Sequence, residues 1–199
     1  RQVQAARRAP VISPTDPTAL TGAQLRRWRL VMVVIAVAGY GLDQWTKAEA
    51  VAHLDPDDPP SWLGGFFTLR LLRNPGAAFS MGSTATVLIS LFAVAMLIVV
   101  CTWGVPKARH RWSLIACGML IAGICGNLTD RIFREPGPLR GHVVDFISLP
   151  HFAVFNVADI FITCTAILVV LVSIFGRHDG EGHATDDNVR GERDEKEEM

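Results

Sequence analysis

The sequence is poor in charge and in the cysteine patterns that stabilise small domains. Of its 199 residues only 19% are Asp, Glu, Lys or Arg, whereas a soluble domain usually carries about 25%. Its four cysteines stand inside apolar runs without a Cys-x-x-Cys pair, so we expect neither a disulfide framework nor a zinc site. Half of the residues are apolar, which excludes a disordered chain. The cations are not concentrated as a nucleic-acid-binding protein requires.

Several catalytic motifs are absent as well. The chain has no His-Glu-x-x-His of a helical zinc protease, no Gly-x-Ser-x-Gly of a serine hydrolase and no glycine-rich phosphate loop. His142 and His151 flank Asp145, and a metal site built from these histidines stays open as an alternative. Their loop lacks the ligand spacing of known metal motifs, so we expect no metal and no cofactor.

The chain contains long apolar runs instead. Residues 85–105 and 112–129 contain no charge, and residues 154–175 contain a single one, Asp159. At about 1.5 Å per residue, a helix of 20 or so residues spans roughly 30 Å, the thickness of the hydrocarbon core of a bilayer. With a less uniform first segment, residues 28–51, the pattern predicts four transmembrane helices.

That first segment has two interpretations. Asp43 and Lys47 are four residues apart, so on a helix they face each other and can pair at the membrane boundary. Alternatively, the segment is a secretory signal peptide, with a basic start, residues 30–42 as its apolar core and Ala48-Glu49-Ala50 as its cleavage site. Three further spans follow, and no soluble domain, which favours the transmembrane helix.

Charge is distributed unevenly along the chain. Basic residues stand at the points that four spans would place on one side of a membrane, namely Arg26, Arg27, Arg29, Lys107, Arg109, Arg111 and Arg177. The positive-inside rule therefore predicts cytoplasmic termini, with residues 52–84 and 130–153 facing outward. We expect three parts: a basic cytoplasmic segment (1–27), a membrane domain (28–175) and a disordered, acidic cytoplasmic tail (176–199).

Between the first two spans, one segment has the composition of a strand. Residues 66–72 place aromatic and branched side chains around Thr68 and Arg70, which predicts a short interfacial strand. Asn74-Pro75-Gly76 follows it and is typical of a turn.

Four carboxylates stand within or beside the apolar segments, at Asp43, Asp130, Asp145 and Asp159. An ionised carboxylate in a bilayer is costly, so each is a candidate functional residue. Asp130 and Asp159 have matching settings, because an asparagine precedes each by three residues. On a helix that spacing allows Asn127 and Asn156 to hold their own carboxylates by hydrogen bonds.

The predicted topology brings three of these acids to the outer membrane edge. Two carboxylates that lie close together cannot both ionise easily, so they share a proton, as in an aspartic protease. The local symmetry alone favours Asp130 with Asp159, with Asp145 close by. A purely structural alternative pairs the acids as interfacial anchors with basic residues of the same region, namely Arg131, Arg134 and Arg140.

Two other classes of function compete with a protease. A proton-coupled transporter uses buried acids as a relay, but it places them near the bilayer midplane and shows matching halves, which this chain lacks. A non-catalytic membrane scaffold does not require the carboxylates at the outer edge.

The order of five short motifs resembles that of lipoprotein signal peptidase (signal peptidase II), the bacterial intramembrane aspartic protease family. The resemblance covers residues 28–175 and rests on residues 43–47 (DQWTK), 74–80 (NPGAAFS), 126–131 (GNLTDR), 141–146 (GHVVDF) and 155–159 (FNVAD). Each motif alone is weak, whereas five in this order are specific. Residues 134–140 look like an insertion relative to the family, and Pro75 stands where many members have threonine.

The resemblance implies an all-α polytopic membrane protein with four transmembrane helices and a small extracytoplasmic β-cradle. It implies removal of the signal peptide from diacylglyceryl-modified prolipoproteins, just before the lipidated cysteine. By the family pattern the catalytic pair is Asp145 and Asp159. The family's supporting or substrate-binding residues fall on Asp43, Lys47, Asn74, Gly76, Asn127, Asp130, Arg131 and Asn156.

The resemblance also implies the setting of the protein. We expect a monomer in the bacterial plasma membrane, with its active site near the outer face. Its partners are then lipidated prolipoprotein signal peptides and membrane lipids, and no nucleic acid.

Overall fold

The computed structural model describes residues 20–76 and 82–175. Arg177, the acidic tail and most of the basic N-terminal segment lie outside the described residues, as do residues 77–80 of the second motif.

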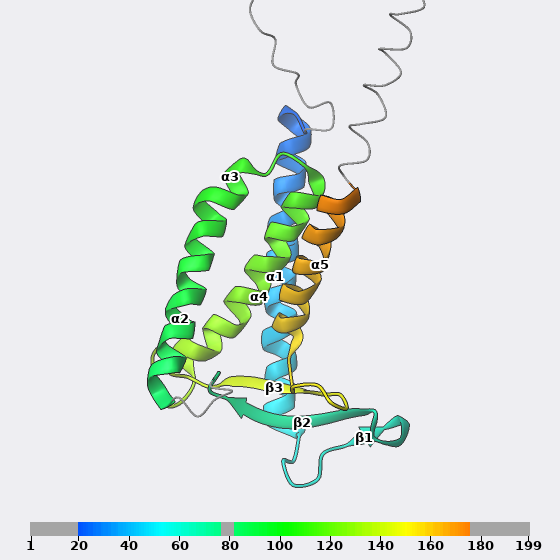
Figure 1. Cartoon of the computed structure of the whole chain (residues 1–199), viewed down its shortest axis with the longest axis vertical. Coiled ribbons are helices and arrows are strands. Elements are labelled where there is room, and N and C mark those ends of the chain that lie inside the picture. Colours follow the sequence, from blue (N-terminus) through cyan, green and yellow to red (C-terminus); the bar gives the residue numbers. More distant parts are fainter. Residues whose placement is uncertain (1–19, 77–81, 176–199) are drawn as a thin grey trace, which may run out of the picture.

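Four long helices lie side by side and form the body of the molecule (Figure 1). They are α1 (Gly22–His53), α2 (Gly82–Val99), α4 (Arg111–Phe133) and α5 (Val157–Phe175). At its end α2 widens into a π-helix, η2 (Val100–Gly104), and continues into the short α3 (Val105–Lys107). Within the described residues, three helical stretches are long and apolar enough to cross a membrane: Ala85–Lys107, Arg111–Phe133 and Val157–Phe175. The three apolar runs predicted from the sequence are therefore confirmed as helices.

The remaining helix, α1, is 32 residues long and carries Asp43 and Lys47 in its second half. Both side chains are buried, so α1 places this pair of opposite charges inside the protein. The Ala48-Glu49-Ala50 segment of the signal-peptide interpretation lies within this helix, where Ala50 packs against Val144 and Phe146.

The bundle is not uniform, because α4 packs closely against both α1 and α5 while α2 contacts chiefly α4. Small residues on α4 permit this close packing. The glycines of α4 that lie against α1 or α5 are Gly118, Gly123 and Gly126.

A three-stranded antiparallel sheet lies across one end of the bundle (Figure 1). Its order is β1 (Ser61–Trp62), β2 (Phe67–Asn74) and β3 (Val143–Ser148), with the 3₁₀ turn η1 (Leu63–Gly65) between β1 and β2. The strand predicted at 66–72 is thus confirmed and runs on to Asn74. The small sheet that the family resemblance implied is also present, and β3, which carries Asp145, completes it.

The opposite end of the bundle carries basic residues and, among the described residues, no Asp or Glu. The start of α1, the connection from α3 to α4 and the end of α5 all lie there (Figure 1). Described cations at this end include Arg26, Arg27, Lys107 and Arg111. The segments predicted to share one side of a membrane therefore share one end of the fold.

Candidate active site

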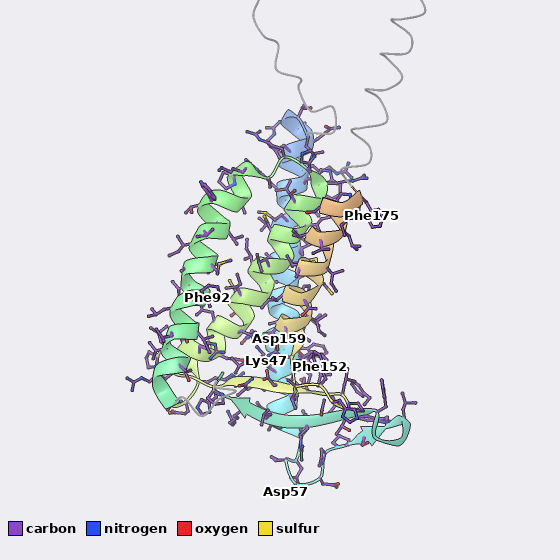
Figure 2. The ribbon with its side chains drawn as sticks, viewed as in Figure 1. Lys47, Asp57, Phe92, Phe152, Asp159 and Phe175 are labelled. Carbon is purple, nitrogen blue, oxygen red and sulfur yellow. The ribbon has the colours of Figure 1, made fainter. Side chains whose placement is uncertain are left out.

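The two proposed catalytic carboxylates come from different elements that meet where the bundle joins the sheet. Asp145 lies in β3, and Asp159 lies in the first turn of α5. Figure 2 labels Asp159 and Lys47 at the end of the helices that meets the sheet.

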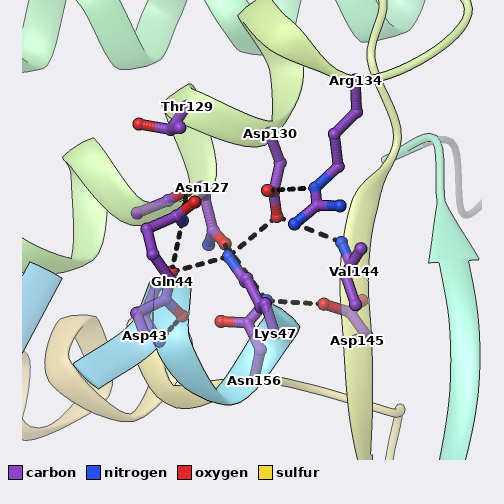
Figure 3. Close-up of polar contacts among 12 residues, drawn as sticks. Asp43, Gln44, Lys47, Asn127, Thr129, Asp130, Arg134, Val144, Asp145 and Asn156 are labelled. Atoms are coloured by element: carbon purple, nitrogen blue, oxygen red, sulfur yellow. Dashed lines mark hydrogen bonds and ion pairs between the residues drawn. The ribbon is translucent and has the colours of Figure 1, made fainter. Parts of the chain in front are cut away.

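Asp145 is buried, with only 1% of its surface exposed. Its Oδ2 accepts a hydrogen bond of 2.7 Å from the Asn74 amide. Its Oδ1 accepts one of 2.6 Å from the Asn156 amide (Figure 3). Both donors are neutral, so Asp145 is held in place without an ion pair among the described residues.

Asp159 is half-buried and takes part in a reciprocal cap at the start of α5. Asn156 precedes the helix, and its Oδ1 accepts a hydrogen bond from the Asp159 backbone N–H at 3.1 Å. In return, the Asp159 Oδ2 accepts one from the Asn156 backbone N–H at 3.2 Å, the geometry of a capping box. The Asn127 amide donates to the other oxygen, Oδ1, at 2.7 Å.

The expectation that each asparagine holds the carboxylate three residues later is therefore wrong in detail. Asn127 donates across the helix interface to Asp159, and not to Asp130. Asn156 uses its oxygen for the helix cap, which leaves its NH₂ group free to donate to Asp145. The orphan N–H groups of a helix start compete for the side chain that precedes it, and this outweighs the simple same-face argument.

Asp130 and Asp43 belong to an ionic cluster instead. The Lys47 Nζ lies 2.8 Å from Asp43 Oδ2 and 2.9 Å from Asp130 Oδ2, and all three side chains are buried. The pairing of Asp43 with Lys47 predicted from their spacing is thus confirmed. Asp130 also pairs with Arg134 at 2.5 Å. Of the anchor residues considered from the sequence, Arg134 is thus the partner of Asp130, whereas Arg140 is exposed.

Arg131 reaches the turn that follows β2. Its guanidinium packs against Gly76, where an added Cβ would come within 2.9 Å of Nη2. The Gly76 N–H in turn donates to the Asn74 Oδ1 at 2.7 Å, which fixes the Asn74 amide toward Asp145. Within the described part of the chain, the buried Nη1 of Arg131 has no hydrogen-bond partner.

One residue of the cluster was not singled out from the sequence. Gln44 donates to Asp43 Oδ2 at 3.0 Å and to the Gly126 carbonyl at 3.1 Å. Its position inside the first motif, between the two charged residues, was the available signal.

Burial raises the pKa of Asp145 to about 6. The nearby charge of Asp159 also raises this pKa, while hydrogen bonds from Asn74 and Asn156 and the charge of Lys47 lower it. Asp145 therefore keeps its proton to a higher pH than an ordinary carboxylic acid does. A carboxyl that is protonated near pH 6 beside a second carboxylate is suited to general acid–base chemistry.

The alternative metal site has no support in the geometry. Among the described residues, no three His, Cys, Asp or Glu side chains lie close enough together to hold an ion. His142 is half-buried, and His151 is exposed.

Comparison with known proteins gives a consistent result. A family model described as "Signal peptidase (SPase) II" (Peptidase_A8) matches residues 35–175. A lipoprotein signal peptidase of Rhodococcus jostii is 45% identical over 148 residues, 74% of each chain. One of Mycobacterium avium is 42% identical over 165 residues, which cover 82% of this chain and 90% of that one.

A solved structure shares the fold as well. It is described as a bacterial membrane enzyme, is 27% identical and has a TM-score of 0.64 over 73% of this chain and 93% of its own. The match by the family model, the identity to the two relatives and the shared fold agree. The chain belongs to the signal peptidase II family of aspartic peptidases.

Proposed function

We propose that this chain is the membrane endopeptidase that removes signal peptides from prolipoproteins, with Asp145 and Asp159 as its catalytic dyad. The observation that carries this proposal is the way the two acids are held. Asn156 bridges them, and each receives neutral donors only, whereas Asp43 and Asp130 are bound in ion pairs. A dyad must share one proton, which a directly bound cation on either member would oppose.

The dyad supplies both the base and the acid of a hydrolysis. The ionised carboxylate takes a proton from water, and the water oxygen attacks the scissile carbonyl carbon. The protonated carboxyl donates a hydrogen bond to the oxygen on which negative charge develops. The tetrahedral species collapses when the departing nitrogen is protonated and the C–N bond breaks. This route forms no covalent enzyme intermediate.

The direct test is a cleavage assay on the purified full chain in detergent. We expect release of the signal peptide from a diacylglyceryl-modified precursor, just before the lipidated cysteine, and little release from the unmodified precursor. The absence of cleavage from a correctly folded protein would contradict the proposed function. Activity that a chelator abolishes and zinc restores would favour the alternative site at His142 and His151.

For the membrane arrangement, we propose that α1 is a fourth span and that the sheet end faces outward in a bacterial plasma membrane. Residues 28–175 are then the peptidase domain, flanked by cytoplasmic segments 1–27 and 176–199, and the enzyme acts as a monomer. The support is the charge asymmetry: among the described residues, the end opposite the sheet carries Arg and Lys but no Asp or Glu, whereas both signs occur at the sheet end.

This orientation predicts the accessibility of two exposed positions. In a variant whose four native cysteines are replaced, a cysteine at Arg109 is expected to react with a membrane-impermeant thiol reagent only from the cytoplasmic side. A cysteine at Pro138, in the loop before β3, is expected to react only from outside. Labelling of intact cells and of inverted vesicles distinguishes access from outside from access from the cytoplasmic side. The reverse pattern would place the dyad on the cytoplasmic side and contradict the proposal.

The raised pKa of Asp145 predicts the pH dependence of cleavage. The dyad needs one proton, so activity falls at low pH, where both acids are protonated, and again as pH rises through the higher apparent pKa. The hydrogen bond from Asn74 lowers the pKa of Asp145, and its loss in Asn74→Leu raises that pKa. The bell-shaped profile of kcat is therefore expected to move to higher pH. Arg73→Gln, on the opposite face of the strand, should leave it in place; an unmoved profile in Asn74→Leu would contradict this role of Asp145.

A further inference from the structure

Lys47 is a fully buried lysine at the centre of the site. An ammonium group has three N–H donors, and three acceptors surround this one (Figure 3). They are Asp43 Oδ2 at 2.8 Å, Asp130 Oδ2 at 2.9 Å and Asn127 Oδ1 at 3.0 Å. The ammonium therefore has all its donors satisfied and faces no reacting group directly.

The two carboxylates around Lys47 extend the network to the backbone. Asp43 Oδ1 accepts a hydrogen bond of 2.8 Å from the N–H of Ala158. Asp130 Oδ2 accepts one of 3.2 Å from the N–H of Val144. These two amides belong to the residues that immediately precede Asp159 and Asp145, respectively. The cluster thus holds the backbone at two equivalent positions, each one residue before a proposed catalytic acid.

We propose that Asp43, Lys47 and Asp130 form an ionic brace, a set of positioning residues that fixes the backbone at residues 144 and 158 and so sets the separation of the two catalytic acids. A third connection runs from Lys47 through Asn127, whose amide donates to Asp159. The inference rests on the proposed function, because it assigns a role relative to that dyad.

The chemistry of the cluster suits a positioning role better than a purely stabilising one. With Arg134, the brace contains two anions and two cations, so it is formally neutral. Buried ion pairs contribute little net stability, because desolvation offsets their attraction, but each charge strongly constrains the geometry of its partners. Precise placement matters for the dyad, since a displacement of about 1 Å can cost on the order of 10²-fold in rate.

The first test is Lys47→Met, which keeps an unbranched side chain one atom shorter and removes its charge and donors. We expect the single-turnover rate to fall about 10²-fold, with little change in KM, because the three side chains of the brace are buried within the protein. The pH profile of cleavage should also move to higher pH. Charged groups that face Asp145 are Lys47 from α1, Arg131 from α4 and Asp159 from α5, and the charge of Lys47 lowers the pKa of Asp145.

Ser90→Ala is the matched control. Ser90 is equally buried, lies on α2 and donates to the Leu139 carbonyl at 2.8 Å, outside the brace. Loss of this hydrogen bond should lower the stability of the protein and leave the pH profile of cleavage unchanged. A folded Lys47→Met enzyme with the profile of the unmodified protein, or an equal shift in Ser90→Ala, would overturn the brace.

A second pair of variants decides the question if Lys47→Met does not fold. Asp130→Asn keeps an oxygen that can accept from Val144 N–H, whereas Asp130→Leu removes both the charge and the acceptor. The brace predicts a single-turnover rate in Asp130→Leu at least tenfold below that of Asp130→Asn, and equal rates would contradict it. The two proposals are tested separately. Cleavage by the unmodified enzyme tests the proposed function, whereas the rates of the brace variants test the brace, so the function can be correct while the brace is wrong.

Discussion

Single-turnover cleavage by Asp145→Asn and by Asp159→Asn is expected to fall by about 10⁴-fold, the upper range for loss of general acid–base catalysis. Asparagine matches aspartate in size and keeps one acceptor oxygen, so the capping box and the hydrogen bond from Asn74 can persist in part. The substitution replaces one titratable carboxyl by an amide, so the pair can no longer share a proton. Each variant should therefore still fold and bind lipidated precursor, which a pull-down with the intact precursor measures alongside cleavage.

The double variant and Asp130→Asn complete this prediction. Because the two acids act as one unit, the double variant should be little worse than either single one. Asp130→Asn should retain measurable turnover and chiefly lower the folded yield, since Asp130 binds Lys47 and Arg134. Substantial cleavage by Asp145→Asn, combined with an inactive Asp130→Asn, would instead support the pairing of Asp130 with Asp159 that the local symmetry of the sequence suggests.

A single methyl group on α4 is expected to have the second large effect. In Gly126→Ala, the added Cβ would lie 2.5 Å from Asp43 Oδ2 and 3.0 Å from the Cβ of Ala158. The same Asp43 oxygen pairs with Lys47, so the methyl group must push apart the ion pair or the helices. Breaking a buried pair costs about 3–5 kcal/mol, a large part of the roughly 5–15 kcal/mol that stabilises a typical protein.

We therefore expect Gly126→Ala to give little folded protein on size-exclusion chromatography and a clearly lower Tm for whatever is recovered. Gly41→Ala on α1 is the matched control, because nothing lies within 4 Å of an added Cβ there. Alanine is favoured over glycine in a helix by about 1 kcal/mol, so this variant should be as stable as the unmodified protein or more so. Equal yields for the two variants would show that α4 and α1 can separate without loss of the site.

The features that the sequence predicts well are those that depend on neighbours along the chain. Hydropathy alone identifies the helices at 111–133 and 157–175, because a long uncharged run has few alternatives. The pairing of Asp43 with Lys47 follows from a spacing of four on one helix. The strand at 67–74 follows from its composition and from the turn after it.

The features that it does not predict depend on contacts between distant segments. Asn127 lies three residues before Asp130 and yet bonds to Asp159, 32 positions away. Residues 143–148 show no alternation of polar and apolar side chains, because the first four residues of β3 are all buried. The motif pattern of the family points to Asp145, whereas the residues alone favour Asp130. No local rule reveals that an asparagine would bridge two acids from separate elements.

The distribution of charge within the brace bears on how such a protein enters a bilayer. Asp43 and Lys47 neutralise each other within α1, and Asp130 pairs with Arg134 four residues on, at the end of α4. The pair on α1 can therefore enter the membrane already neutralised, before α4 has been synthesised. The contact between Lys47 and Asp130 forms only when the two helices meet. It joins two pairs that are already neutral, so neither pair has to wait for the other helix before its net charge is cancelled.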